Sequence, residues 1–294
     1  MDSDLQKSPS VLQTDPKYIA QLDWRQGCIF SRNMVIQLQS DGEEIIKGIS
    51  VSEKEIIKGA KESDLLIVVT HDCNLVNDSF ENEPEIEVVL ARSVSTKNAS
   101  LFWGKNPRKF QFELQSEQFL YEICVHDRVF LPRNLLLNHS PDLERVLEAS
   151  LRKQICLWVS KRYFRAAFPD SFNKITEKLK KKLAEKLKKK GKEITAIYIA
   201  GADEEVQDNG TYEIIVKATM QCNTFENPVL RQEAQSIIDL WESELCECPG
   251  IEVKESSLVS EADVSIDDLR ILKRWDYDHL SFSGDTPEEI APYP

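Results

Sequence analysis

Short apolar runs, separated by clusters of Gly, Asn, Pro and Asp, recur between Trp24 and Leu131. Some runs alternate apolar and polar residues and others are β-branched, and both patterns are typical of β-strands. The runs occupy residues 28–30, 34–38, 65–70, 86–91, 110–114, 119–125 and 129–131. Five to seven short strands can close a small barrel, so the sequence predicts an SH3-like β-barrel domain over residues 21–141. The charged stretch 40–63 is expected to be an insertion between strands that contains a helical turn.

Helical periodicity begins after this region. Asp142 is a candidate helix N-cap, and the apolar residues that follow it recur mainly at spacings of three and four. This pattern predicts a linking helix within residues 142–170 that ends before Pro169. A second helix is predicted from Ser171 to about Lys190, with Gly191 as its C-terminal stop.

The remainder of the chain alternates strand and helix patterns. Strands are predicted at residues 194–200, 212–220 and 251–259, with a helix at 228–245 before the last strand. Asn209-Gly210 indicates a turn between the first two strands. With the preceding helix this makes an αββαβ unit, so residues 171–294 are expected to form an α+β domain with an acidic tail. The whole chain is assigned to the α+β class, with residues 1–20 as a disordered arm.

Composition indicates a globular protein. Of the 294 residues, 41% are hydrophobic and 30% are charged, so a sizeable core is available. No apolar run approaches the roughly 20 residues that span a bilayer, and residues 1–10 lack a secretory signal pattern. Seven scattered cysteines fit reduced thiols, and Cys246-Glu247-Cys248 has no second ligand pair at zinc spacing. We therefore expect a cytoplasmic protein that contacts no membrane and carries no metal or cofactor.

Charge is divided unevenly along the chain. Residues 142–192 hold 16 Lys and Arg residues against 6 Asp and Glu residues, whereas residues 193–294 hold 6 against 23. Ten lysines fall between Lys174 and Lys192, where Ile175, Leu179, Leu183 and Leu187 form an apolar stripe. The candidate anion-binding residues on this helix are Lys181, Lys182, Lys188 and Lys189. Such a face binds a phosphate backbone, or it docks on acidic parts of the same chain or of a partner.

A pair of arginines precedes the basic helix. Arg162 and Arg165 are about one helical turn apart, so both could reach one phosphate or carboxylate. They could equally tie the helix to acidic residues of the flanking domains, and we favour this second interpretation.

The string Thr70-His71-Asp72-Cys73-Asn74 follows the apolar run 65–70 directly. On an extended strand His71 and Cys73 would point to the same face, where the imidazole could activate the thiol as a nucleophile. The alternative is a small buried thiol beside a hydrogen-bonded turn histidine. A second pair, His126-Asp127, could complete a metal site with the first, although we favour the interpretation that both pairs are ordinary turn residues.

The N-terminal half resembles the small barrel of MazF/PemK-type toxins. Arg25-Gln26-Gly27-Cys28-Ile29-Phe30 is similar to their opening strand, residues 65–74 to the strand that ends in a polar turn, and residues 88–95 to the next strand. His126-Asp127-Arg128-Val129 is similar to a late strand, so the resemblance spans residues 24–135. It implies metal-independent RNA cleavage. At the comparable places this chain has Lys61, where the family has arginine, and Ser93 or Ser95.

These observations lead to one main functional hypothesis and two alternatives. The first is an intracellular toxin- or defence-type protein that cleaves RNA, with Lys61 and Arg92 as electrostatic stabilisers, Ser93 as a polarising group and His71 as a base. The second is a non-enzymatic module that assembles with a partner protein, or with a second copy of the chain, through acidic and basic surfaces. The third is a Cys73-dependent hydrolase. The sequence contains none of the motifs GxGxxG, GxxxxGK[ST], GxSxG and HExxH, so the corresponding nucleotide-binding, hydrolase and zinc-protease assignments have no support.

Overall fold

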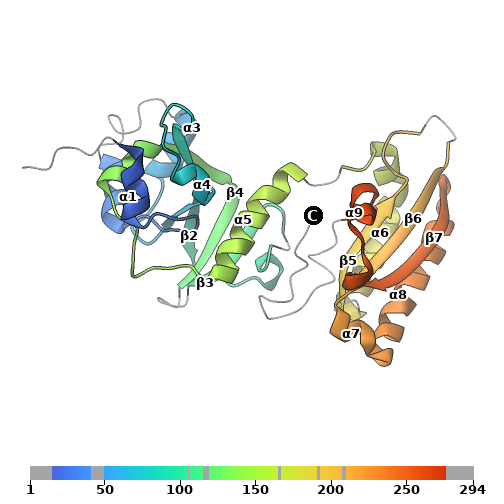
Figure 1. The fold of residues 1–294 in the computed structure, drawn as a ribbon. Helices are drawn as coiled ribbons and strands as arrows, with labels where there is room; N and C mark the ends of the chain where they lie inside the picture. Colours follow the sequence, from blue (N-terminus) through green and yellow to red (C-terminus); the bar gives the residue numbers. More distant parts are fainter. Residues whose placement is uncertain are drawn as a thin grey trace, which may run out of the picture. The chain divides into compact units, whose positions relative to one another are not determined.

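The computed structural model describes residues 15–40, 50–104, 106–114, 119–164, 167–190, 193–206 and 210–275. It divides into two compact units, residues 1–159 and 160–294 (Figure 1). Each unit contains one four-stranded sheet and several helices, which confirms the α+β class. No described helix is long and apolar enough to cross a membrane.

The sheet of the first unit is open. It is built from β1 (Leu65–Val68), β2 (Glu85–Val94), β4 (Phe119–Pro132) and β3 (Lys109–Leu114), in that order and all antiparallel. The expected closed barrel is therefore wrong. β1 and β3 are the two edge strands, and no pairing joins them among the described residues.

Helices cover both faces of this sheet. One face packs under α1 (Arg32–Ser40) and α3 (Val51–Lys58) around Leu66, Val88 and Leu131. The other face packs against α5 (Ala149–Phe164) through Ile155, Trp158 and Val159 (Figure 1). Successive side chains of a strand point to opposite faces of the sheet, so neighbouring residues of these strands pack in different apolar cores.

Some element predictions for this unit need correction. Residues 34–38 lie in α1, not in a strand, with Met34, Val35 and Leu38 buried on one side. The two runs 119–125 and 129–131 belong to the single strand β4. Asp142 accepts hydrogen bonds from the amides of Glu144 and Arg145, but α5 begins only at Ala149, so Asp142 does not cap it.

Short elements connect these parts. They are the 3-10 helices η1 (Pro16–Leu22), η2 (Ala99–Leu101) and η3 (Arg133–Asn138), and the one-turn helix α4 (Asp72–Leu75). Ile19 of η1 is fully buried, so the predicted arm does not extend past residue 15, and residues 1–14 lie outside the described part.

The second unit follows the predicted order of helix, strand, strand, helix and strand. The elements are α6 (Asp170–Lys190), β5 (Ile194–Ala200), β6 (Tyr212–Met220), α8 (Pro228–Cys246) and β7 (Ile251–Ser260). The additional elements are α7 (Cys222–Glu226), η4 (Glu261–Asp263), α9 (Ile266–Ile271) and β8 (Lys273–Arg274). The sheet order is β7-β6-β5-β8, with β6 and β7 parallel. The turn residue Asn209 lies outside the described residues.

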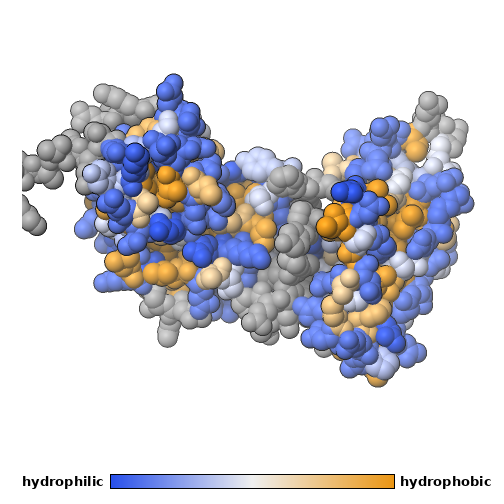
Figure 2. Space-filling view, in the orientation of Figure 1, coloured by the Kyte–Doolittle hydropathy of each residue, from blue (hydrophilic) through white to orange (hydrophobic). Residues whose placement is uncertain are grey.

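The two faces of this second sheet differ. Helices α6 and α8 cover one face through a core that includes Phe172, Leu183 and Trp241 (Figure 1). The short helix α9 lies on the other face, where Leu272 packs on Ala196 and Tyr198. Apolar side chains of α9 stay exposed, notably Ile266 and Ile271, and apolar surface is visible near α9 in Figure 2.

Candidate functional site

A buried carboxylate joins two of the candidate residues. Asp64, which is only 2% exposed, stands directly before β1. Its Oδ2 accepts a hydrogen bond from the Lys61 amide at 2.9 Å, and its Oδ1 accepts one from the Ser93 amide at 2.9 Å. A buried carboxylate needs such donors to offset its desolvation. Asp64 thereby holds Lys61 and Ser93 at one end of the sheet.

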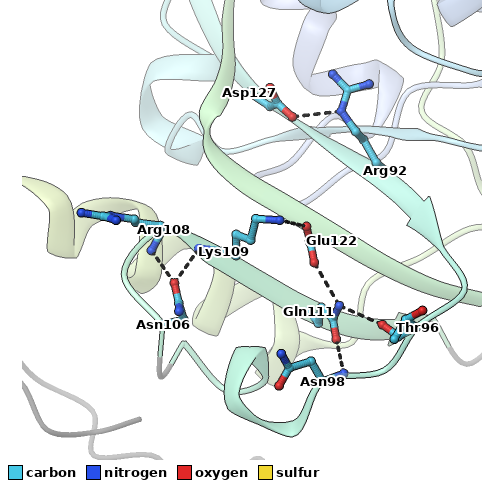
Figure 3. Close-up of polar contacts among 9 residues, drawn as sticks. All are labelled: Arg92, Thr96, Asn98, Asn106, Arg108, Lys109, Gln111, Glu122 and Asp127. Carbon is cyan, nitrogen blue, oxygen red and sulfur yellow. Dashed lines mark hydrogen bonds and ion pairs between the residues drawn. The ribbon is translucent and has the colours of Figure 1, made fainter.

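Arg92 belongs to the same place. Its Nε donates to Asp127 Oδ2 at 3.0 Å, and its Nη1 donates to the Gly59 carbonyl at 3.2 Å (Figure 3). Asp127 lies where β4 gains extra residues against β2, beside a register shift between Val89 and Ala91. We call Lys61, Arg92 and Asp127 the rim site. Ser93 contributes its backbone amide to Asp64, while its side chain points to the face opposite that of Arg92.

Polar residues continue from the rim site across the sheet. Arg92 of β2 lies opposite Glu122 of β4, which lies opposite Gln111 of β3. We call these three residues the polar row (Figure 3). Glu122 also binds Lys109 at 2.7 Å, and this hydrogen bond and charge raise the pKa of Lys109 above its usual value.

The Gln111 side chain is the centre of the polar row. It is 3% exposed, and its Nε2 donates to Glu122 Oε2 at 3.0 Å and to the Thr96 carbonyl at 3.1 Å. Its Oε1 accepts from the Asn98 amide at 2.8 Å. The amide therefore anchors the segment after β2 to the sheet.

His71 and Cys73 lie beyond the other end of β1. His71 is the N-cap of α4, where its Nδ1 accepts from the Cys73 amide at 3.3 Å, so the two residues do not share a strand face. The five steps along the chain from Asp64 to Val69, at about 3.3 Å each, amount to roughly 16 Å. The structure therefore places the backbones of Lys61 and Ser93 at one end of β1, and His71 and Cys73 beyond the other end.

The two His-Asp pairs are also separate. Asp72 accepts a hydrogen bond from the Gln26 amide at 2.6 Å, whereas Asp127 accepts one from Arg92 at the rim site. Among the described residues, no group of three or more His, Cys, Asp or Glu side chains could hold a metal ion.

The basic candidates lie near the unit boundary and in the second unit. Lys181, Lys182, Lys188 and Lys189 belong to α6, but their side chains lie outside the described part. Helix α6 buries Phe172, Thr176, Leu179 and Leu183 and packs beside the acidic helix α8. Arg162 is exposed in the last turn of α5, and Arg165 lies outside the described residues.

Asp64 and Gln111 were not among the site residues predicted from the sequence. A lone carboxylate just before an apolar strand was the signal for Asp64, and a polar residue inside the alternating run 110–114 was the signal for Gln111. Neither signal predicts the more distant partners, since Ser93 lies 29 residues from Asp64 and Glu122 lies 11 residues from Gln111.

Comparisons with known proteins give no relative: no protein-family model, no curated protein and no solved structure matches this chain. The resemblance of residues 24–135 to MazF/PemK-type toxins therefore stays a prediction.

Proposed function

We propose that the first unit binds RNA by contacting its phosphates at the rim site, in a protein of the toxin or defence kind. The observation that carries this proposal is the tie that Asp64 makes to both Lys61 and Ser93. It holds together the backbones of two separate segments. Lys61 and Arg92 supply an ammonium and a guanidinium, and both groups suit a phosphate. The Ser93 side chain alternates with that of Arg92 along β2 and therefore points to the opposite face of the sheet.

Arg92 has donors left for a ligand. The hydrogen bonds to Asp127 and Gly59 use two of the five N–H groups of its guanidinium, and the side chain is 38% exposed. Asp127 fixes the orientation of the guanidinium, which lowers the entropy cost of binding a phosphate oxygen. Lys61 is exposed and adds a second positive charge.

The proposed activity is RNA binding, and it does not require that the RNA be cleaved. The base that the sequence suggested, His71, is separated from the rim site by the length of β1. A general base must come within hydrogen-bond reach of the hydroxyl that it deprotonates. The rim site supports phosphate recognition without that group.

The test is RNA binding as a function of salt. Wild type should bind a labelled single-stranded RNA, and affinity should fall as salt rises because phosphate contacts release counterions. The variant Lys61→Ala with Arg92→Ala should bind more weakly, with a salt slope smaller by about 1.4. Lys254→Ala with Arg270→Ala removes the same charges from the second unit and should behave as wild type. Absence of binding by wild type, or an unchanged rim variant, would refute the proposal.

A second candidate function is assembly with a partner protein through the charged second unit. The observation that favours it is a contrast in charge. Lys174 is exposed on α6, outside the set of residues that this helix buries, whereas the rest of the unit is acidic. Charge reversal at Lys181, Lys182, Lys188 and Lys189 should then abolish a salt-sensitive complex. Complex formation that survives the reversal would count against this function.

A further inference from the structure

Trp103 has an unusual backbone conformation. Its φ is 62°, in the left-handed region, where a bulky side chain is a genuine outlier. Gly104 follows with φ 69°, so the chain makes a tight left-handed bend at these two residues. Strained residues of this kind persist only where the surroundings enforce them, and they cluster at ligand-binding sites.

The neighbours of Trp103 place it at the edge of the first sheet. Phe102 forms a bridge with Gln111 on the edge strand β3. A Cβ atom added to Gly104 would lie 3.5 Å from the side chain of Trp158, which packs on the face of the sheet that α5 covers. Trp103 therefore stands where the chain turns around the edge strand, and it is partly exposed. The Gln111 amide holds the same segment through Thr96 and Asn98, so the bend is anchored.

Basic side chains surround this edge. Lys97 lies 5.0 Å from the centre of the Phe102 ring and binds Glu113 at 2.8 Å, with 60% of its side chain exposed. Lys109, half exposed, and the exposed Arg108 belong to the adjacent end of β3. Aromatic rings flanked by positive charge are the combination that binds unpaired nucleic-acid bases, because the ring stacks on the base while the cations follow the backbone.

The polar row connects this edge to the rim site. Arg92, Glu122, Gln111 and Phe102 lie on successive neighbouring segments, so three spacings of about 4.8 Å separate Arg92 from Phe102, roughly 14 Å in all. The two places are therefore close enough for one RNA strand to reach both.

We propose that Trp103 stacks on an unpaired base of the RNA whose phosphates contact the rim site, an inference that rests on the proposed function. The Trp103 ring is partly exposed and lies 6.1 Å from the Phe102 ring, centre to centre, at the sheet edge. The ligand is single-stranded because a duplex hides the faces of its bases.

The experiment measures affinities for a labelled single-stranded RNA and for a duplex of the same length. Trp103→Ala should weaken single-strand binding roughly 5- to 100-fold, the range measured for lost base stacking. Trp103→Phe should restore most of the affinity. Duplex binding should change little. The salt slope should stay at the wild-type value, because a stacking contact releases no counterions.

Two controls separate stacking from folding. Trp103→Gly relieves the left-handed strain, so it should lose affinity while its melting temperature equals or exceeds that of wild type. Phe130→Ala removes an exposed ring at the far end of β4, where Phe130 pairs with Glu87, and should bind as wild type.

The outcomes distinguish the two proposals. If wild type binds single-stranded RNA and depends on Lys61 and Arg92, but Trp103→Ala and Trp103→Gly bind equally well, the stacking inference is overturned and the rim site stands. If affinity falls equally for single strands and duplex, stacking is also overturned. If wild type binds no RNA, the proposed function fails and the inference fails with it.

Discussion

The carboxylate of Asp64 accepts a hydrogen bond from the backbone amide of Ser93, 29 residues away, at 2.9 Å. The same carboxylate accepts from the Lys61 amide, so one buried side chain sets the relative position of two segments. The geometry of the rim site is thus a consequence of how the start of β1 is fastened to the end of β2.

Asp64→Asn should destabilise the first unit. The new NH₂ group would face one of the two amides that now donate to the carboxylate, leaving a buried donor without an acceptor. The expected loss in the free energy of unfolding is about 1–3 kcal/mol. Urea unfolding measures it. The exposed neighbour Glu62 provides the control, since Glu62→Gln should change the same free energy by less than about 0.5 kcal/mol. Equal stability of the two variants would show that the tie is dispensable.

Most strands of the first unit were predictable, whereas the topology was not. The runs 65–70, 86–91 and 110–114 correspond to β1, β2 and β3. Residues 34–38 were assigned to a strand, although so short an apolar run fits the periodicity of a strand and that of a helix equally well. In the structure this segment is a helix, because its apolar side packs against the sheet. Strand order, which decides between a barrel and an open sheet, depends on pairings that no local pattern encodes.

The candidate site was predicted in part. Asp64 ties the backbones of Lys61 and Ser93 together, whereas the side chains of Arg92 and Ser93, neighbours on β2, point to opposite faces of the sheet, so their shared role stays a prediction. His71 was placed on an extended strand, but β1 ends at Val68, and the imidazole accepts an amide hydrogen bond that starts a helical turn. A side chain that can cap a helix competes with strand continuation, and the sequence alone did not show which would win.

Arg133 should be among the most sensitive positions of the first unit. It is fully buried, and its guanidinium donates to five backbone carbonyls, those of Asn74, Leu75, Asn77, Ser79 and Glu83. Arg133→Met would leave these carbonyls without their donor. We expect a loss of about 3 kcal/mol or more.

The measurement for Arg133 combines urea unfolding with limited proteolysis, which should cut residues 74–83 first. Arg270→Met removes a guanidinium that is 73% exposed and should leave stability within about 0.5 kcal/mol of wild type. If Arg133→Met resists protease as wild type does, the guanidinium does not organise this segment.

Asp142 should make stability depend on pH at the acid end. Burial alone would raise its pKa, but hydrogen bonds from the Arg145 side chain and from the amides of Arg145 and Glu144 outweigh burial and leave the pKa below its usual value. A depressed pKa in the folded state gives stability that is complete above the unfolded pKa, near 3.8, and is lost as pH falls through the folded value.

Asp142→Asn tests this dependence. Wild type should be more stable than the variant at pH 7 by about 1 kcal/mol or more, and the difference should shrink as pH falls below about 4. Urea unfolding at pH 7, 5, 4 and 3 gives the difference directly. A gap that stays constant across these values would mean that the carboxylate charge contributes nothing.

Gln111→Glu should release the segment that carries Trp103. The substitution puts a carboxylate oxygen where Nε2 now donates to Glu122 and Thr96, so acceptors would face acceptors in a buried place. Stability should fall by about 2 kcal/mol. Hydrogen exchange at residues 95–104 should speed up more than in β1. Glu85→Gln, an exposed change at the start of β2, should leave both readouts unaffected. Unchanged exchange in Gln111→Glu would contradict the anchoring role.

Thiol labelling should separate the cysteines by burial and test the remaining hydrolase alternative. Burial raises the pKa of Cys156 to about 11, so at pH 8 it has almost no reactive thiolate and should label slowly with iodoacetamide. Cys73 and Cys222 are both exposed and should label at similar rates, because His71 is engaged with the Cys73 amide. Peptide mapping by mass spectrometry gives each rate, and labelling in denaturant should equalise them. A Cys73 rate many times that of Cys222 would instead indicate an activated nucleophile and favour the hydrolase.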